Sequence, residues 1–251
     1  MAAGQEHGRY EIRNLTTLAE LGEAVRLQKE IWGFEDIELL PLRLFVVAQK
    51  VGGQTLGAFD GGRMVGFLLA IPGLKQGQMY LHSHMMGVRP EYRNAGLGRR
   101  MKLMQREEAL GRGIELVEWT FDPLEIKNAY FNIERLGAVV RRYVLNQYGT
   151  TTSPLHGGLP TDRCVAEWHL ASERVEALAA GRGKAPVEVV ERVAVPAGIA
   201  ELREKDPRLA REIQAGVSAR FLEYFGKGLA VTGFETTTEA GTYLFGRWDS
   251  K

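Results

Sequence analysis

LHSHMMGVRPEYRNAGLGRR, residues 81–100, reads as an apolar-rich strand, a short basic turn and then glycines at the start of a helix. The start of a helix presents unpaired backbone N–H groups and the positive end of the helix dipole, so it binds anions. Glycines at positions 96 and 98 let a phosphate approach the backbone, and Arg93 and Arg99 add positive charge close by. The segment therefore predicts a site for a ligand that carries phosphate groups.

The order of residues in this segment is more specific than its glycines alone. A dinucleotide-binding fingerprint needs a glycine where Met101 stands, and a P-loop needs a Gly-Lys-Ser/Thr run that the chain lacks. What remains is a strand, a Val-x-Pro-x-Tyr-Arg turn, a Gly-x-Gly pair and an amphipathic helix. This order resembles the acyl-coenzyme A binding motif of the GNAT superfamily of N-acyltransferases, and the match is carried by Val88, Pro90, Tyr92, Arg93, Gly96 and Gly98. The alternative is a surface turn that opens a helix.

The resemblance implies acetyl-CoA, or another acyl-CoA, as the cofactor. In the GNAT fold the strand before the turn bulges, which leaves backbone N–H groups unpaired. By resemblance we expect the bulge at about Met86 and Gly87, with the N–H of Met86 or its neighbour facing the oxyanion and Val88 bonding the pantetheine arm. Asparagines on the helix after the fifth strand often hold the cofactor. The expected cofactor-binding residues are Met86, Gly87, Val88, Arg93, Asn94, Ala95, Gly96, Leu97, Gly98, Arg99, Asn128 and Asn132.

Two histidines are candidates for removing a proton from an acceptor amine. Alternation along a strand places His82 and His84 on one face, which Met86 and Val88 would continue. Histidine titrates at about 6.5, so its neutral form is available at neutral pH. The His-x-His arrangement resembles that of arylalkylamine N-acetyltransferases. We expect His82 to be the general base, with His84 acting through water; the alternative is a pair of satisfied core residues.

The proton donor to the leaving thiolate is less well indicated. Many GNAT enzymes place a tyrosine four residues before the glycine that ends this helix, but counting back from Gly137 gives Ile133. Tyr130, one turn earlier, is the first choice. The alternatives are Tyr143, Tyr148 or departure of the thiolate without help, and each tyrosine could instead pack in the core.

The acceptor region is expected near the end of the fifth strand. Glu118 on that strand is an alternative base. The long glycine-rich loop at 155–163 has the composition of a lid. Arg141, Arg142 or Arg163 could grip a carboxylate of the acceptor, although ordinary ion pairs are the alternative.

The composition limits which cellular compartments and which classes of partner are expected. The 251 residues include 32 Lys plus Arg and 31 Asp plus Glu, a formal charge of +1, so no overall field favours nucleic acid or a membrane surface. The single cysteine, Cys164, excludes an internal disulfide and fits a cytoplasmic setting. We expect no signal peptide, since residues 1–8 lack an apolar segment, and no membrane span. No residue is assigned to a metal.

Apolar periodicity and turn signals predict elements in the GNAT order. Strands are expected at 10–15, 54–59, 64–71, 78–88, 114–121, 138–145 and 163–170, and helices at 18–32, 41–51, 97–110 and 124–136. This order matches the GNAT layout over residues 9–171 and predicts an α/β (α+β) fold: a mixed, twisted sheet with helices on both faces. The expected domains are an acyltransferase core at 1–171 and a small α+β appendage at 172–251, which could cover the acceptor site or form a homodimer contact.

Spacing also predicts which helix faces are buried. In the motif helix we expect Arg100 and Lys102 on the solvated side. The appendage is expected to hold a helix at 171–180, a strand at 187–195, a helix from Pro207 to Gly226 and strands at 229–234 and 242–248. The apolar face of the helix after Pro207 is expected to carry Leu209, Ile213, Val217, Phe221 and Phe225.

Together these features predict an acyl-CoA dependent N-acyltransferase. It would move an acetyl or other short acyl group to a primary amine of a small molecule or amino acid by direct attack through a tetrahedral intermediate. The alternative is a catalytically silent GNAT-like domain that binds acyl-CoA as a sensor or scaffold, which the missing tyrosine favours. A nucleic-acid partner is disfavoured by the net charge.

Overall fold

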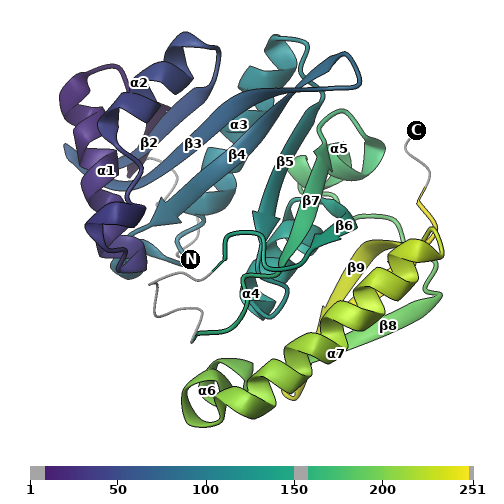
Figure 1. The fold of residues 1–251 in the computed structure, drawn as a ribbon. Coiled ribbons are helices and arrows are strands. Elements are labelled where there is room, and N and C mark those ends of the chain that lie inside the picture. The colour runs from purple at the N-terminus through teal and green to yellow at the C-terminus, as the bar shows by residue number, and fades with distance from the viewer. Residues whose placement is uncertain (1–8, 150–157, 249–251) are drawn as a thin grey trace, which may run out of the picture. The chain divides into compact units, whose positions relative to one another are not determined.

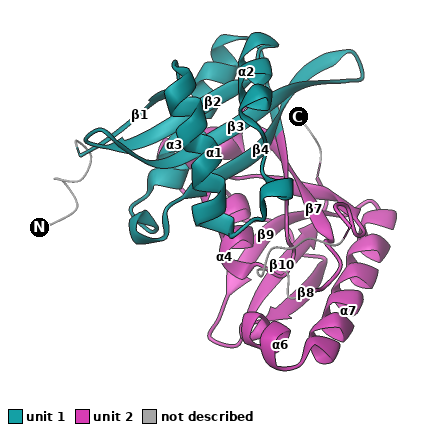
Figure 2. Ribbon diagram, turned by 60° about the vertical axis from the view of Figure 1, so that its left-hand side comes forward, with its two compact units in different colours: residues 1–117 teal, residues 118–251 magenta. Residues whose placement is uncertain are grey.

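The computed structural model describes residues 9–149 and 158–248, and the chain divides into two compact units, residues 1–117 and 118–251 (Figure 2). Of the loop predicted at 155–163, residues 155–157 lie outside the described ranges. The boundary predicted between residues 171 and 172 falls inside the second unit, and the division into core and appendage stays a prediction.

The first unit contains strands β1-β2-β3-β4, paired in this order and all antiparallel. They are β1 (Tyr10–Asn14), β2 (Gln54–Asp60), β3 (Arg63–Lys75) and β4 (Gln78–Val88). Short hairpins join β2 to β3 and β3 to β4, and left-handed backbone at Gly61 and Gly77 makes these tight turns possible. The strands lie where the sequence predicts them, except that β3 continues past Ile71 to Lys75.

Helices lie on both faces of these strands (Figure 1). They are α1 (Leu18–Trp32), α2 (Leu42–Lys50) and α3 (Leu97–Gly111), with short 3-10 turns at Asp36–Glu38 and Pro90–Tyr92. α1 begins at a capping box, in which the side chains of Thr17 and Glu20 each accept a bond from the other's backbone N–H. It ends at Gly33, whose φ of 67° is left-handed. Local signals in the sequence therefore determine both ends of α1.

Alternation along β3 separates the two faces. Phe67 and Leu69 point to the face covered by α1 and α2, where they join one apolar cluster with Leu27. Gly66 lies on the α3 face, because a Cβ atom on it would come within 3.4 Å of the Met101 side chain. The two faces are called the α1–α2 face and the α3 face below.

The second unit carries strands in the order β5-β7-β6-β9-β10-β8. They are β5 (Leu116–Phe121), which begins at the end of the first unit, β6 (Val139–Val144), β7 (Arg163–His169), β8 (Glu191–Pro196), β9 (Ala230–Thr236) and β10 (Ala240–Gly246). The helices are α4 (Ile126–Tyr130), a π-helical turn (Phe131–Arg135), α5 (Glu173–Ala179), α6 (Ile199–Lys205) and α7 (Pro207–Gly226). β6 pairs antiparallel with β7, and β10 pairs antiparallel with β9 and β8.

The strands of the predicted appendage continue the pairing of the predicted core. β9 pairs antiparallel with β6 at Val231 and Val140. Aromatic rings pack across this join, since the ring of Phe221 on α7 lies 5.2 Å from that of Tyr143 and 4.9 Å from that of Tyr243. The last segment of the chain therefore shares one apolar core with β6.

Two helical predictions for this unit are wrong in detail. The single helix expected at 124–136 contains a π-helical turn, in which the N–H of Leu136 reaches the carbonyl of Phe131. The buried side of α7 includes Val217 and Phe221 as predicted, but Leu209 is 39% exposed. Helix α6 was not predicted from the sequence.

None of the helices among the described residues combines the length and the apolar character that a bilayer crossing needs.

Candidate functional site

The two histidines of β4 lie side by side, as their spacing predicts. Their ring centroids are 5.8 Å apart, with the ring planes at 44°. His82 pairs with Ile71 of β3, which packs against the apolar cluster of the α1–α2 face, so His82 lies on that face. Desolvation lowers the pKa of His84 below its ordinary value of 6.5, although part of the residue is exposed. The imidazole of His84 is therefore neutral at pH 7 and able to accept a proton.

The pairing of β4 with β3 is interrupted by a β-bulge at His84. Along the pairing of β3 with β4, Ala70 lies opposite Ser83 and Leu69 lies opposite Met85. His84 is the extra residue between these pairs and has no counterpart of its own on β3.

The bulge corrects two predictions about the rest of β4. Met86 pairs with Leu68 and Val88 with Gly66, and both partners lie on the α3 face. Met86 and Val88 therefore do not continue the histidine face, because the extra residue inverts the alternation beyond it. In the pairing with β3, the bulge is at His84 and not at Met86 and Gly87.

The start of α3 presents backbone donors without a capping side chain. Its N-cap is Gly96, whose φ of 74° is left-handed, and no side chain caps the helix. Leu97, Gly98 and Arg99 follow, and the N–H groups of these first helical residues have no partner within the helix. A Cβ atom on Gly96 would meet nothing within 4 Å, so the space before the helix is open. These residues fit a phosphate-bearing group.

The turn before α3 carries its own special backbone. Asn94 is left-handed with a φ of 67°, which asparagine tolerates better than most residues. Arg93 is exposed, and its Nε donates to the carbonyl of Val88 at 3.3 Å. Ala95 and Arg99 are half-buried. The turn therefore carries Arg93 as an exposed cation directly beside the helix start.

Two other cations of α3 are structural, and the prediction that they lie on a solvated face is wrong. Arg100 is half-buried, and its Nη2 donates to the carbonyl of Tyr10 on β1 at 2.8 Å. Lys102 is 2% exposed, and burial lowers its pKa well below the ordinary 10.5. Lys102 follows Met101 on the side of α3 that packs against the strands. Its place beside Met101 was the one signal in the sequence that Lys102 is buried.

α4 and the π-helical turn hold the residues expected to bind the cofactor arm and to donate a proton. Asn132 is 2% exposed, and its Nδ2 donates to Oδ1 of the exposed Asn128 at 3.2 Å, so both lie on one face. Tyr130 is 39% exposed. Ile133 is fully buried, so the position where the family often has a tyrosine is a core position in this chain.

Glu118 takes part in a network of ion pairs on the strands of the second unit. It is 4% exposed and accepts from Nη2 of Arg142 at 2.6 Å, while Nε of Arg142 lies 3.2 Å from Glu167. Arg141 donates to the same Glu167 at 2.9 Å. Burial would raise the pKa of Glu167, but His169 and the two arginines outweigh it and lower this pKa to about 2. Arg141 and Arg142 thus form ion pairs within the chain, the alternative that the sequence left open.

The remaining candidates near this network are tied to their neighbours. Arg163 is 8% exposed, donates to the carbonyl of Asp162 at 2.9 Å and lies over the ring of Tyr148. Tyr143 is 9% exposed, its Oη lies 2.9 Å from Oγ of Ser218, and burial raises its pKa above the ordinary 10. The neutral phenol of Tyr143 therefore has a structural role in the core.

The segment after β5 is anchored by an ion pair between Asp122 and Arg203, and no motif in the sequence points to this pair. Oδ1 of Asp122 accepts from the N–H of Leu124 at 2.8 Å, and Oδ2 pairs with Nη2 of Arg203 at 2.7 Å. Nη1 of Arg203 also lies 2.9 Å from Glu125. Because Arg203 belongs to α6, the C-terminal part of the chain holds the turn that leads into α4.

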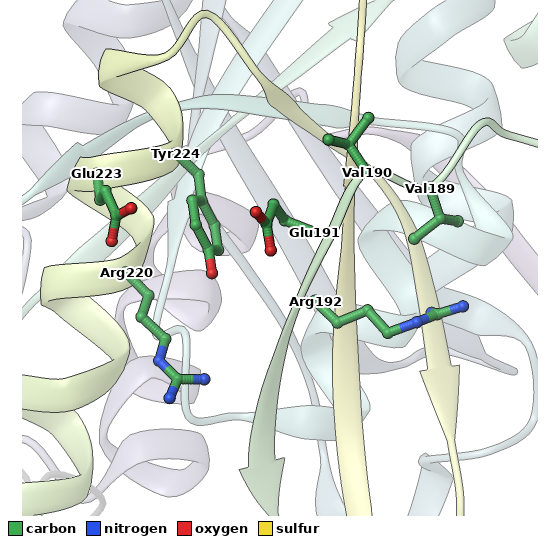
Figure 3. Close-up of a pocket in the computed structure, with 7 residues that line it drawn as sticks. All are labelled: Val189, Val190, Glu191, Arg192, Arg220, Glu223 and Tyr224. Atoms are coloured by element: carbon green, nitrogen blue, oxygen red, sulfur yellow. The ribbon is translucent and has the colours of Figure 1, made fainter.

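A cavity of about 510 Å³ lies between β8 and α7, and none of the residues that line it is a candidate site residue predicted from the sequence (Figure 3). Glu191 of β8 and Tyr224 of α7 face each other across it, and Arg220 and Glu223 extend from the same helix. Its acidic and basic side chains balance, so its charge favours no class of ligand. Within residues 9–149 and 158–248, no group of three or more His, Cys, Asp or Glu could hold a metal ion.

Comparison with known proteins finds a family match over part of the chain. Residues 19–137 match the acetyltransferase (GNAT) family, so the match includes β4, the glycine turn and α4. No curated protein matches the chain.

Solved structures share the fold at low sequence identity. The protein smu.2055 of Streptococcus mutans UA159 is 16% identical, with a TM-score of 0.53 over 64% of this chain and 99% of that one. A putative acetyltransferase of the GNAT family from Desulfovibrio desulfuricans is 14% identical, with a TM-score of 0.51 over 64% and 99%. Arabidopsis thaliana Naa50, in complex with the bisubstrate analogue CoA-Ac-MVNAL, is 14% identical, with a TM-score of 0.50 over 63% and 97%. Residues 19–137 therefore match the acetyltransferase (GNAT) family, and the solved structures show that the chain shares its fold with them.

Proposed function

We propose that this protein is an acyl-CoA dependent N-acyltransferase that moves an acetyl group, or another short acyl group, to a primary amine of a small molecule or amino acid. The observation that carries the proposal is the combination found within the first unit. The open, uncapped start of α3 directly follows the strand that pairs two histidines on one face. The family match of residues 19–137 supports acetyl-CoA as the donor, since GNAT acetyltransferases generally bind it.

The start of α3 would bind the phosphates of the donor. The N–H groups of Leu97, Gly98 and Arg99 point out of the helix, and their partial positive charge adds to that of Arg93. When bound, acetyl-CoA supplies an activated thioester. The N–H of Met86 stays our choice for stabilising the oxyanion, and the amides of Asn128 and Asn132 stay candidates for holding the cofactor arm.

The histidine face of β4 would handle the proton of the acceptor. A primary amine is mostly protonated at pH 7 and must lose a proton before it attacks the thioester. His82 would accept this proton, and the neutral His84 at 5.8 Å between ring centroids is close enough to relay it through a water molecule. The exposed Tyr130 stays the first choice for returning a proton to the thiolate. Glu118 becomes a less favoured candidate for the base, because its carboxylate already accepts a hydrogen bond from Arg142.

One observation favours the second candidate function, a domain that binds acyl-CoA without catalysis. The position expected to carry the acid is the fully buried Ile133, which cannot donate a proton. The two functions differ in turnover. A sensor would bind acetyl-CoA and leave the thioester intact in the presence of any amine.

The test is release of coenzyme A thiol from acetyl-CoA in the presence of a panel of primary amines and amino acids. Amine-dependent thiol release by the wild-type protein supports the enzyme. Binding of acetyl-CoA by calorimetry without thiol release with any amine supports the sensor. Absence of both binding and release contradicts both functions.

The donor site can be tested separately with a matched pair of glycine variants. Gly96→Glu places a carboxylate before α3, where it repels phosphate, while Gly61→Glu places the same side chain at a hairpin. Both glycines have a positive φ and open space around a new Cβ atom, so the backbone strain is comparable. We expect calorimetry to show loss of acetyl-CoA binding for Gly96→Glu only. Equal affinity of the two variants contradicts the proposed donor site.

A further inference from the structure

The second unit holds another cavity, of about 540 Å³, and its lining is rich in cations. Its walls come from α5, the segment at 182–188, β9 and the residues that follow β10. Among the described residues, four cationic and two acidic side chains line it: Arg174, Arg182, Lys184 and Arg247, and Glu173 and Glu188. The volume is that of a site for a small molecule. The excess of cations distinguishes it from the balanced cavity between β8 and α7.

Two of these cations are held close to each other. Arg174 is half-buried, and its Nε and Nη2 donate to the carbonyls of Gly137 and Ile133 at 3.0 and 3.1 Å. Lys184 is half-buried and forms an ion pair with Glu134. Burial lowers the pKa of Lys184, and repulsion by Arg174 lowers it further. An anion in the cavity would relieve this repulsion.

Two buried polar atoms of the lining have no hydrogen-bond partner within residues 9–149 and 158–248. One is Oγ1 of Thr232, a residue that is 3% exposed, and the other is Nε1 of Trp248. Buried polar groups are nearly always paired in proteins, because an unpaired one costs stability. The indole Nε1 can only donate, and a hydroxyl can donate as well. The two atoms therefore fit a ligand that supplies oxygen acceptors.

The backbone leaves room beside the hydroxyl of Thr232. Thr232 is the extra residue of a β-bulge in the pairing of β9 with β10, and such a bulge re-aims a side chain. A Cβ atom on Gly246 would lie 3.3 Å from Oγ1 of Thr232 and 2.2 Å from the carbonyl oxygen of Glu188. Any larger residue at position 246 would therefore crowd the hydroxyl and push away the segment at 182–188.

We propose that this cavity binds a small organic anion that carries phosphate or carboxylate groups. The exposed guanidinium groups of Arg182 and Arg247 would pair with its charged oxygens, as would the ammonium group of Lys184. The hydroxyl of Thr232 and the indole N–H of Trp248 would donate to its remaining oxygens. None of the residues that the sequence predicts for acyl transfer lines this cavity.

NMR of the indole N–H of Trp248, assigned from Trp248→Phe, tests binding in the full-length protein. Inorganic pyrophosphate and succinate are titrated separately at physiological ionic strength, with putrescine as a cationic control. We expect a saturable shift of this signal with at least one of the two anions and none with putrescine. A response to pyrophosphate alone indicates a phosphate-bearing ligand, and a response to succinate alone indicates a dicarboxylate. No saturable shift with either anion overturns the proposal.

Two variants with matched controls locate the bound anion. Thr232→Val removes only an unpaired hydroxyl, so it should leave Tm unchanged or raise it, and yet weaken binding of the anion about tenfold. Thr236→Val, at the exposed end of the same strand, should not change the affinity.

Arg182→Gln should also weaken binding about tenfold, whereas Arg208→Gln, on the exposed side of α7 and outside the cavity, should not. If Thr232→Val and Arg182→Gln bind the anion as tightly as the wild type, the anion binds elsewhere and the proposal is overturned. A lower Tm of Thr232→Val with unchanged affinity also overturns it, because the hydroxyl would then have a structural role. The readout needs no thiol release, so the result stands whether or not the protein transfers acyl groups.

Discussion

Replacing Arg203 with methionine should strongly destabilise the second unit, although the residue is far in sequence from any motif. Its side chain is 5% exposed and pairs at 2.7 Å with Asp122, whose side chain is 10% exposed. Methionine keeps most of the volume of the side chain but takes the guanidinium of Arg203 away from the buried carboxylate of Asp122. The N–H of Leu124 would still donate to that carboxylate, and Arg163 would still interact with it electrostatically.

The expected size follows from the burial of the pair. Removing one partner of a buried ion pair costs about 3–5 kcal/mol. The bond that Asp122 retains to the N–H of Leu124 favours the lower end of this range, and the second pair, with the half-exposed Glu125, adds roughly 1 kcal/mol at most. We therefore expect Arg203→Met to lower the free energy of unfolding by about 3 kcal/mol, a large part of the roughly 5–15 kcal/mol that stabilises a domain.

Urea unfolding at pH 7 measures this difference, and α6 supplies a matched control. Lys205 lies on the same helix and pairs with Glu201, but both side chains are more than half exposed, so Lys205→Met should cost less than about 1 kcal/mol. The double variant Arg203→Met with Asp122→Asn should recover part of the loss, because it also removes the buried negative charge. If Arg203→Met costs no more than Lys205→Met, the assigned role of the buried pair is wrong.

Three further changes test other parts of the structure. Because burial lowers the pKa of Lys102, the unfolded chain binds its proton more readily, so the stability of the wild type relative to Lys102→Met should rise as pH increases from 7 toward 10, as measured by urea unfolding at both values. The pKa of Glu20 is lowered to about 2, first by its bond to an arginine and then by the capping box. Its contribution to folding stability is therefore present above pH 4.5 and is lost toward pH 2. In a series of thermal-unfolding experiments at acid pH, Glu20→Gln should make the fall of Tm with decreasing pH less steep. Gly87→Ala should cost about 1–3 kcal/mol, since the new Cβ would lie 2.8 Å from Cδ1 of Ile31, whereas Gly22→Ala, with nothing within 4 Å, should be neutral or stabilising in the same unfolding assay.

The helices and strands of the first unit could be predicted from signals between residues close together in the sequence. The bounds of β4, the start of α3 and the two ends of α1 follow from alternation, glycine placement and capping residues that lie within a few positions of each other. The same is true of the pairing of Asn128 with Asn132, since a spacing of four sets one helix face.

Features that depend on distant partners were not predictable. The bulge at His84 appears only in the pairing of β4 with β3, so simple alternation placed Met86 on the wrong face. Burial of Lys102 depends on finding Ser83 and Gln105 as partners, and a lone lysine in a basic segment gives no sign of them. Asp122 and Arg203 are 81 positions apart, and no periodic pattern relates them.

The most direct test of the account is the rate of coenzyme A thiol release by His82→Ala, compared with the wild type and with His169→Ala. His169 lies at the end of β7 and has no assigned role in the reaction. If His82 removes the proton of the amine, His82→Ala should be slower by about a hundredfold or more at pH 7, while acetyl-CoA affinity and the rate of His169→Ala are unchanged. A His82→Ala protein that releases thiol as fast as the wild type would show that the histidine face of β4 does not carry the base.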